Sequence, residues 1–261
     1  MDRLRISIVT PSFNRRLYLE RCIDSVLEQD YPNFEHIVID GASHDGTVDL
    51  LRQYKHVKWV SEPDKGQSQA INKGFVMATG DILAWLNSDD EYLPGAFSTV
   101  AEATAETRGQ AVIVGGVKLY LNDSFLRMMP NHSHSFFRFL NPWIPYTNIS
   151  QPGVFLPRSV WEKIGSLNEE LFYVMDYDLL CRILKNKIPL VTVPKTLAKY
   201  NLHDNCKTGR GWHVIYPELD RLILDYARRL EGVKKGLFYA SFMLLRPAIR
   251  GFSRVMFPPI Y

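Results

Sequence analysis

Cysteine and long apolar runs are scarce in this sequence. Its three cysteines, Cys22, Cys181 and Cys206, are an odd number, and no two are spaced as in a zinc or redox motif. Cys22 and Cys181 stand among helix-forming residues, so we expect small buried hydrophobes and a reducing compartment. No stretch reaches the roughly 18 apolar residues that span a bilayer, and the apolar run after Arg5 is too short for a signal-peptide core. We therefore expect a cytoplasmic protein.

Glycine-rich phosphate motifs are also absent. Neither G-x-G-x-x-G nor G-x-x-x-x-G-K-[ST] occurs, so the dinucleotide-binding and P-loop classes lack their phosphate cradle. There is no internal repeat and no low-complexity segment. The 261 residues are 46% hydrophobic and 23% charged, as in an ordinary globular protein. This length and composition predict one large domain, alone or with an appendage.

The net charge is small but unevenly distributed. It amounts to +3, yet residues 226–261 carry seven Lys or Arg against one acid, Glu231, so the preceding body is mildly acidic. From residue 232 onward the basic residues are interleaved with apolar ones, a composition that suits binding to an anionic membrane surface. A helix packed on the main domain, or on a second copy in a homodimer, explains the same composition equally well.

The first part of the chain alternates strand and helix signals. Strands are expected at 4–10, 34–39, 57–60 and 82–86, and helices at 16–29, 47–54 and 67–78. We expect the first strand to stop at Pro11, and the helix at 67–78 to close with Gly80 in a left-handed conformation. The alternation predicts a Rossmann-like α/β fold, with a mostly parallel central sheet and helices on both faces.

The pattern changes after residue 110. We expect a long strand at 111–121 with a bend at Gly115-Gly116, helices at 160–165 and 178–185, and a strand at 190–200. Residues 130–150 show no periodicity and are expected to form a loop over the site. The predicted division is one domain over 1–212, with halves at about 1–110 and 111–212, followed by a helical, basic extension over 213–261.

Polar clusters follow several of the predicted strands. They lie at 10–14, 40–45 and 87–90, at the carboxyl ends where open α/β sheets bind ligands. Asp89 and Asp90 are adjacent acids, which repel each other unless a cation such as Mg²⁺ or Mn²⁺ lies beside them. A solvated acidic turn is an equally good explanation of this pair. Asp40 ends a strand and could accept hydrogen bonds from a nucleobase or a ribose.

Further clusters lie in the second part of the chain. Asp176 is suited to act as a general base, although an acid at a helix N-terminus is also favoured by the helix dipole. His203 could bind a metal or a diphosphate, and Lys207 could hold a phosphate. A structural role explains a lone histidine equally simply. Trp143, in the aperiodic loop, could stack on a sugar.

Taken in order, these segments resemble glycosyltransferase family 2, the inverting enzymes of GT-A fold. The resemblance covers roughly residues 5 to 210, and the ordered series is far more specific than any one motif. It is carried by the segments 7–14 (SIVTPSFN), 39–47 (IDGASHDGT), 62–74 (EPDKGQSQAINKG), 78–81 (ATGD), 86–90 (LNSDD), 151–155 (QPGVF), 175–179 (MDYDL) and 203–208 (HDNCKT). Two positions depart from the family pattern, because many relatives have an acid where Asn87 stands and Glu where Met175 stands.

The resemblance implies a role for each matching position. Asp176 is the expected catalytic base. Asp90 is the expected direct metal ligand, with Asp89 and His203 beside it. The expected nucleotide-sugar site comprises Thr10, Pro11, Phe13, Asn14, Asp40, Asp64, Lys65, Gln67, Asn72, Ser88, Asp89 and Lys207. The expected acceptor site comprises Gln151, Trp143 and Asp178.

The function implied by this resemblance is sugar transfer. The donor would be a UDP-, GDP- or dTDP-linked sugar, the cofactor Mg²⁺ or Mn²⁺, and the acceptor a glycan or lipid-linked glycan of cell-surface polysaccharide assembly, with no nucleic acid involved. One alternative is a sugar-nucleotide pyrophosphorylase, a class with a glycine-rich signature after strand one that 10–14 lacks. Another is a silent sugar- or nucleotide-binding module, against which the presence of Asp90 and Asp176 argues.

Overall fold

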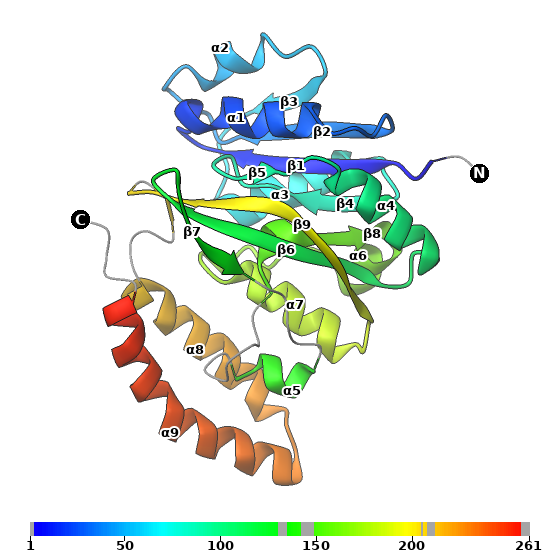
Figure 1. The fold of residues 1–261 in the computed structure, drawn as a ribbon. Helices are drawn as coiled ribbons and strands as arrows, with labels where there is room; N and C mark the ends of the chain where they lie inside the picture. The colour runs from blue at the N-terminus through cyan, green and yellow to red at the C-terminus, as the bar shows by residue number, and fades with distance from the viewer. Residues whose placement is uncertain (1–2, 130–134, 142–148, 205, 208–211, 257–261) are drawn as a thin grey trace.

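The computed structural model describes residues 3–129, 135–141, 149–204, 206–207 and 212–256 (Figure 1). Its first part comprises β1 (Ile6–Ser12), α1 (Arg16–Leu27), β2 (Phe34–Asp40), α2 (Thr47–Leu51), β3 (Val57–Ser61), α3 (Gln67–Met77) and β4 (Ile82–Trp85). There follow β5 (Glu91–Tyr92), α4 (Ala96–Glu106), β6 (Val112–Leu121), β7 (Ser124–Met129), α5 (Phe136–Phe139), the 3₁₀ turn η1 (Gln151–Gly153) and β8 (Val154–Pro157). The last elements are α6 (Arg158–Ile164), α7 (Met175–Lys185), β9 (Leu190–Leu202), α8 (Trp212–Arg228) and α9 (Gly232–Met256).

One sheet runs through the centre of the molecule, in the order β3-β2-β1-β4-β8-β6-β9-β5, with β7 paired to β6. The strands β3, β2, β1 and β4 are all parallel, and Ile8 of β1 pairs with His36 on one side and Ala84 on the other. Every residue of β1 is buried, as expected for a central strand covered on both faces. The α/β class predicted from the alternation is confirmed.

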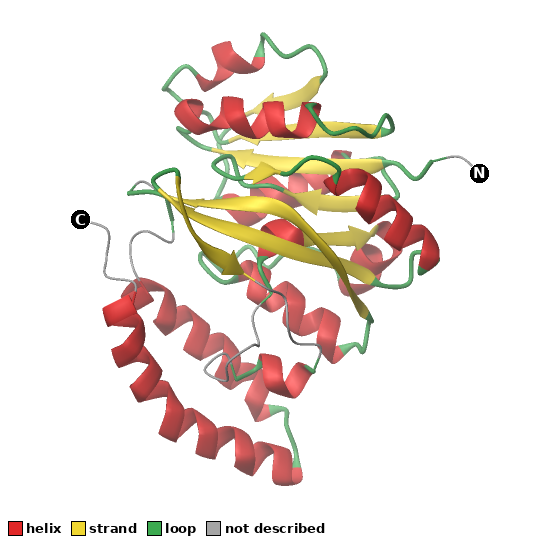
Figure 2. Ribbon diagram, in the orientation of Figure 1, coloured by secondary structure: helices red, strands yellow, loops and turns green. Residues whose placement is uncertain are grey.

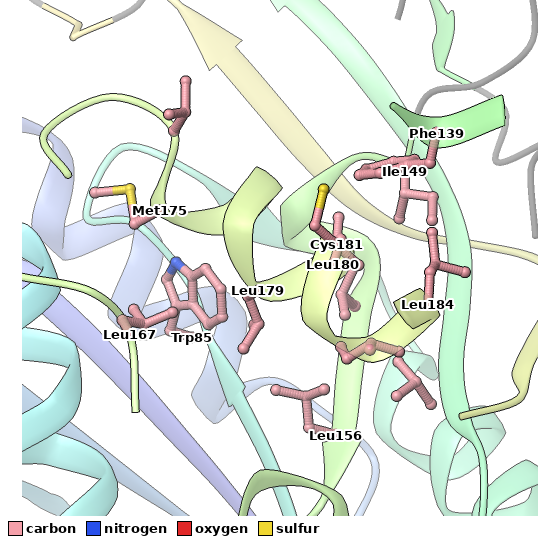
Figure 3. Close-up of a cluster of buried hydrophobic side chains, with 14 of the residues drawn as sticks. Trp85, Phe139, Ile149, Leu156, Leu167, Met175, Leu179, Leu180, Cys181 and Leu184 are labelled. Carbon is pink, nitrogen blue, oxygen red and sulfur yellow. The ribbon is translucent and has the colours of Figure 1, made fainter. Parts of the chain in front are cut away.

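Helices cover both faces of this sheet (Figure 2). Side chains alternate along a strand, so Val9 packs with α3 and α7 on one face while Ile8 packs with α1 and α4 on the other. Figure 3 shows the first of these clusters, where Leu179 of α7 lies close to Trp85 of β4. Cys22 and Cys181 are fully buried free thiols within the two clusters, as predicted.

Two parallel strands, β6 and β9, form the second part of the sheet together with antiparallel neighbours. β8 joins this part to β4, and β9 is followed at the edge by the short β5. At Gly115-Gly116, where a bend was predicted, the register of β6 with β9 shifts on both sides of Gly116. A Cβ on Gly115 would lie 2.3 Å from Cγ of Leu197, so glycine permits β9 to approach this closely.

Two boundaries differ from the sequence prediction. β1 continues through Pro11 to Ser12, because β4 pairs only as far as Val9 and the missing N–H of proline costs no bond there. Gly80 is not left-handed, and α3 already ends at Met77. Glycine is needed at position 80 for space, since a Cβ would lie 2.6 Å from Oγ of Ser7.

The helices α8 and α9 form a hairpin next to α7 (Figure 1). The predicted helical extension from 213 corresponds to α8 and α9, and Phe238 and Phe242 of α9 are buried in the cluster shared with α7. Among the described helices, none combines the length and apolarity that crossing a membrane requires.

Candidate active site

Asp90 lies at the carboxyl end of β4 and is fully buried. Its Oδ1 accepts a hydrogen bond of 3.0 Å from the Asn201 N–H, and its Oδ2 accepts one of 3.1 Å from Nδ2 of Asn87. Burial, together with the charge of the neighbouring Asp89, raises the pKa of Asp90 well above its ordinary value. The ionised form of this carboxyl would be strongly favoured by a nearby cation.

Asp89 contacts a histidine from the far end of the chain. Its Oδ2 lies 3.2 Å from Nε2 of His203, and the ring of Tyr18 stacks on the histidine at 4.1 Å between centroids. The other ring nitrogen, Nδ1, is buried and has no hydrogen-bond partner among the described residues. The fold therefore brings His203 to the acidic pair, as predicted.

The chemistry of these side chains fits a divalent metal ion. Asp89 and Asp90 offer the hard oxygen ligands that Mg²⁺ and Mn²⁺ prefer, and His203 adds an unsatisfied nitrogen. Within the described residues no three side chains of His, Cys, Asp or Glu are grouped so that they alone could hold a metal ion. Mg²⁺ commonly takes few protein ligands and completes its shell with phosphate oxygens and water.

A chain of hydrogen bonds links Lys207 to the acidic pair. Nζ of Lys207 donates to Oε1 of Gln67 at 2.9 Å, and Nε2 of Gln67 donates to Oδ1 of Asn87 at 2.6 Å. The amide of Asn87 in turn donates to Asp90. Asn87, at the position where many relatives have an acid, thus serves as an uncharged link between Gln67 and Asp90.

Gln151, predicted in the acceptor site, joins the same network. Its Oε1 lies 3.5 Å from Nδ2 of Asn87, and its Nε2 donates a bond of 2.7 Å to the Trp85 carbonyl oxygen. The side chain is buried at the start of η1, between β4 and β6. Gln151 is therefore held beside the acidic segment.

Asp176 is the second residue of α7, and its pKa is raised by burial. A 2.8 Å hydrogen bond from the Tyr177 N–H and the positive charge of Lys207 act in the opposite direction. Nζ of Lys207 also lies 3.9 Å above the ring of Phe172. The predicted base and the predicted phosphate-binding lysine are thus brought within electrostatic reach of each other.

A second group lies at the ends of β1, β2 and β3. The buried Asp40 accepts bonds from the N–H of Ser43 at 3.0 Å and from Oγ of Ser61 at 2.6 Å. A Cβ on Gly41 would lie 2.9 Å from Oδ2 of Asp64 and 3.3 Å from Cδ2 of Phe13. Phe13 is 58% exposed, so its ring is open to solvent on the side of Gly41 that Asp64 also lines.

Several residues predicted in the nucleotide site are buried or have polar groups that already hydrogen-bond within the protein. Oγ1 of the buried Thr10 lies 2.9 Å from Nε2 of His36. Oδ1 of Asn14 accepts a bond from the His44 N–H, and the N–H of Lys65 donates to Gln69. Pro11, near the end of β1, and Ser88, just after β4, are both buried.

Two more residues of the predicted sites form hydrogen bonds that stabilise the second part of the chain. The amide of Asn72 binds both the N–H and the carbonyl oxygen of Leu167, which secures the segment before α7. The carboxylate of Asp178 accepts bonds from Arg182 and from the hydroxyl of Tyr226. The bond from Tyr226 joins α8 to α7, so Asp178 serves the packing of these helices. Trp143, predicted to stack on a sugar, lies outside the described residues.

Sequence reasoning missed Asn201, Tyr18 and Glu218. Asn201 holds Asp90 and Tyr18 covers His203, while Glu218 contacts the segment just before α7. Asn201 could have been found, because it lies between the end of the predicted strand at 190–200 and the polar cluster at His203. Tyr18 and Glu218 lie within helical patterns that give no local signal of a contact so distant in sequence.

The fold and the site define an α/β protein with acids gathered at the carboxyl edge of a Rossmann-like sheet. The family model described as "Glycosyl transferase family 2" matches residues 7–165, which is more than half of the chain. The chain belongs to this family, and the resemblance inferred from the motifs is confirmed.

Named relatives match shorter stretches. A Bacillus subtilis protein named as a glycosyltransferase of teichuronic acid biosynthesis, TuaG, is 41% identical over 33% of this chain and 36% of its own length. The "GalNAc(5)-diNAcBac-PP-undecaprenol beta-1,3-glucosyltransferase" of Campylobacter jejuni is 32% identical over 42% of this chain and 37% of its own length. The chain thus matches about a third of the length of these curated relatives.

Solved structures share the fold over nearly the whole chain. TarS from S. aureus, residues 1–349 in complex with UDP-GlcNAc, has a TM-score of 0.71 at 18% identity and covers 97% of this chain and 74% of its own. The mannosyltransferase PcManGT from Pyrobaculum calidifontis, in complex with GDP-Man and Mn²⁺, has a TM-score of 0.67 at 19% identity and covers 98% and 74%. The predicted GT-A fold is confirmed by these neighbours.

Proposed function

We propose that this protein transfers a sugar from a nucleotide-diphospho-sugar to an acceptor hydroxyl, with inversion at the anomeric carbon. The observation that carries the proposal is the network in which Lys207, Gln67 and Asn87 connect the surroundings of Asp176 to Asp90. A base, a cationic phosphate-binding group and an acidic pair are the parts that such a transfer requires.

The donor is proposed to lie along the carboxyl edge of the sheet. Asp64 and the exposed ring of Phe13 suit a nucleoside, because a carboxylate accepts hydrogen bonds from its imide or hydroxyl groups and the ring can stack on the base. The buried Asp40 supports this edge through its bonds from Ser43 and Ser61. Lys207 suits the diphosphate as a compact positive charge. The structural neighbours bound to UDP-GlcNAc and GDP-Man support this class of donor without selecting the nucleobase.

A divalent metal would be held by Asp90 and Asp89, with His203 beside them. When bound, it supplies positive charge that offsets the negative charge growing on the departing nucleoside diphosphate. The raised pKa of Asp90 supports this assignment, because the buried carboxyl lacks a cation among the described residues that would stabilise its ionised form.

The chemical step is proposed to rest on Asp176. Its carboxylate takes the proton of the acceptor hydroxyl while the acceptor oxygen bonds to the anomeric carbon, and the bond from that carbon to the diphosphate oxygen breaks. Its pKa is raised by burial, which makes the carboxylate a stronger base than an exposed aspartate. Attack from the face opposite the leaving group gives a product of inverted configuration.

The acceptor is proposed to be a glycan or lipid-linked glycan of cell-surface polysaccharide assembly. The names of the relatives in Bacillus subtilis and Campylobacter jejuni support this class. On α9, Val233, Leu237 and Leu244 are exposed, and they fall on one side of the helix beside the exposed Lys234. This apolar side is proposed to lie on an anionic membrane surface that presents the acceptor.

Three measurements test these proposals. A thermal-shift panel of UDP, GDP, dTDP and CMP with and without Mn²⁺ should show metal-dependent stabilisation by one diphosphate. Transfer should vanish in D176N while nucleotide binding remains, and NMR of the product should show inversion. Binding without transfer in the wild type would instead indicate a silent binding module. Retention at the anomeric carbon would exclude the single displacement.

Flotation on vesicles of phosphatidylglycerol and phosphatidylcholine tests the membrane surface. The wild type should float, and a variant with Val233, Leu237 and Leu244 changed to Ser should not. Equal recovery of both proteins would exclude lipid binding through this side of α9. A concentration-dependent dimer that the same three substitutions dissociate would assign the surface to a second copy.

A further inference from the structure

One carboxylate on α8 binds three successive backbone N–H groups ahead of α7. Oε1 of Glu218 accepts a hydrogen bond of 2.7 Å from Phe172, and its Oε2 accepts bonds of 2.6 Å from Tyr173 and 3.0 Å from Val174. Such charge-assisted bonds are stronger than those between neutral groups. This contact, the Glu218 clamp, fixes the backbone of residues 172–174 from a helix more than forty positions away.

The clamped segment adjoins both groups assigned to the chemistry. Val174 directly precedes α7, so Asp176 is two residues beyond the last clamped N–H. Phe172, the first clamped residue, lies under Nζ of Lys207 at 3.9 Å. A shift of this short segment would therefore move the base and the support of the lysine together.

Two further hydrogen bonds hold the surroundings of this segment in place. The hydroxyl of Tyr226, roughly two helical turns after Glu218, donates a bond of 2.7 Å to Asp178 on α7. On the opposite side, Oγ of Ser68 in α3 donates to the Leu171 carbonyl oxygen at 3.2 Å. The segment before α7 is thus held between a helix of the sheet domain and a helix of the C-terminal hairpin.

We propose that Glu218 is a positioning residue for sugar transfer, which sets the placement of Asp176 and Lys207 through the backbone of residues 172–174. The C-terminal hairpin is then part of the catalytic arrangement, although it lies beyond the family-matched residues 7–165. This inference rests on the proposed function of Asp176. It assigns Glu218 no contact with donor or acceptor.

The test compares E218Q with D225N in the full-length chain. Gln replaces one carboxylate oxygen by an N–H₂ group that opposes the backbone donors, while Asp225 is an exposed acid of the same helix that pairs with the exposed Arg229. In E218Q, kcat should fall about 10- to 100-fold, because misplacement of a catalytic group by about 1 Å has that effect. The donor KM should change less than about twofold, since uniform binding is untouched.

Two further readouts separate positioning from general stability. Hydrogen exchange at the amides of 172–174 should become at least about tenfold faster in E218Q, without a matching change in the β1–β4 strands. The acidic limb of the pH–rate profile should also move, because the surroundings of Asp176 change. D225N should match the wild type in all measurements. E218D, which keeps the charge and withdraws it by one methylene, replaces E218Q if that variant does not fold.

The inference is overturned by faster exchange with an unchanged kcat, or by a lowered kcat with unchanged exchange at 172–174. A rise in donor KM as large as the fall in kcat would also overturn it, since it would show a loss of donor binding. If the wild type transfers sugar from none of the donors tested, the proposed function fails on its own. The exchange data then still decide whether Glu218 fixes this segment.

Discussion

Nζ of Lys207 donates a hydrogen bond of 2.9 Å to Oε1 of Gln67, although 140 positions separate the two residues in the chain. Gln67 begins α3, which connects the parallel strands β3 and β4, whereas Lys207 follows β9. The bond therefore joins the proposed nucleotide side of the site to the stretch of chain that follows β9.

Replacement of this lysine should weaken diphosphate binding. We expect K207M to bind UDP or GDP at least about tenfold more weakly, because a charge-assisted hydrogen bond contributes about 1.5–3 kcal/mol. Binding of the free nucleoside should stay unchanged, since Lys207 is assigned to the phosphates. Isothermal titration with nucleoside and diphosphate measures both, and K163M on the exposed side of α6 is the control. Equal loss for both ligands would contradict the assignment.

The rate of transfer should depend on the ionisation of Asp176. Burial raises the pKa of this carboxyl, and the base must be ionised, so kcat should fall by about tenfold per pH unit below the raised pKa. Lys207 lowers the same pKa, so the acidic limb in K207M should lie at higher pH than in the wild type. A pH–rate profile of both proteins tests this. Coincident limbs would show that another group titrates.

Asp90 should reduce the stability of the metal-free protein. Its pKa is raised in the folded state, so the ionised form disfavours folding, and stability should fall as pH rises from the ordinary pKa of 3.8 through the raised value. D90N should therefore raise Tm near neutral pH by roughly 2–4 °C for each kcal/mol relieved. The same variant should lose stabilisation by diphosphate with Mn²⁺. A lower Tm in D90N would show that the hydrogen bonds of Asp90 outweigh its desolvation.

His36 should make the fold sensitive to acid. Burial, with a smaller contribution from His56, lowers the pKa of His36 to about 3, so the native state holds this imidazole neutral. The unfolded chain binds the proton near pH 6.5, and stability should therefore fall by up to about 1.4 kcal/mol per pH unit as pH drops below that value. Urea unfolding at several pH values measures the slope. H36Q, which keeps a hydrogen-bonding group for Thr10, should flatten it.

Substitution of Gly80 should test the close approach of the residues before β4 to the start of β1. A Cβ at this position would meet the Arg5 carbonyl oxygen at 2.7 Å and the Ser7 nitrogen at 2.8 Å, and these backbone atoms cannot move independently. We expect G80A to lower the free energy of unfolding by about 1–3 kcal/mol. G236A has nothing within 4 Å and lies in α9, so it should be neutral or slightly stabilising. Equal midpoints in urea would contradict the steric argument.

The parallel part of the sheet could be predicted from the sequence because its signals are local. Strands of apolar residues alternate with amphipathic helices, and polar clusters at 40–45 and 87–90 mark the strand ends. Pro11 misled the prediction, since whether proline ends a strand depends on where the neighbouring strand stops. Gly80 also misled the prediction, because glycine occurs both where a left-handed turn is needed and where there is no space for a Cβ, and the sequence does not distinguish the two.

The site was predicted to the extent that its residues lie in motifs. Asp89, Asp90 and His203 meet as expected, and Lys207 reaches the same network. The motifs do not show which of these side chains already have hydrogen-bond partners within the protein. Thr10 and Asn72 carry polar groups that satisfy internal partners, and this follows only from the packing of β2 and of the segment before α7.

The insertion of β9 between β6 and β5 has a consequence for how the chain folds. β9 pairs with β6 across about eighty positions and with β5 across more than a hundred, contacts of high sequence separation that form slowly. During synthesis, the edge of β6 stays open until Leu202 has left the ribosome, and an unpaired apolar edge invites aggregation. A fragment that ends before this strand is therefore expected to aggregate, and the nucleotide side cannot be obtained as a separate folded piece.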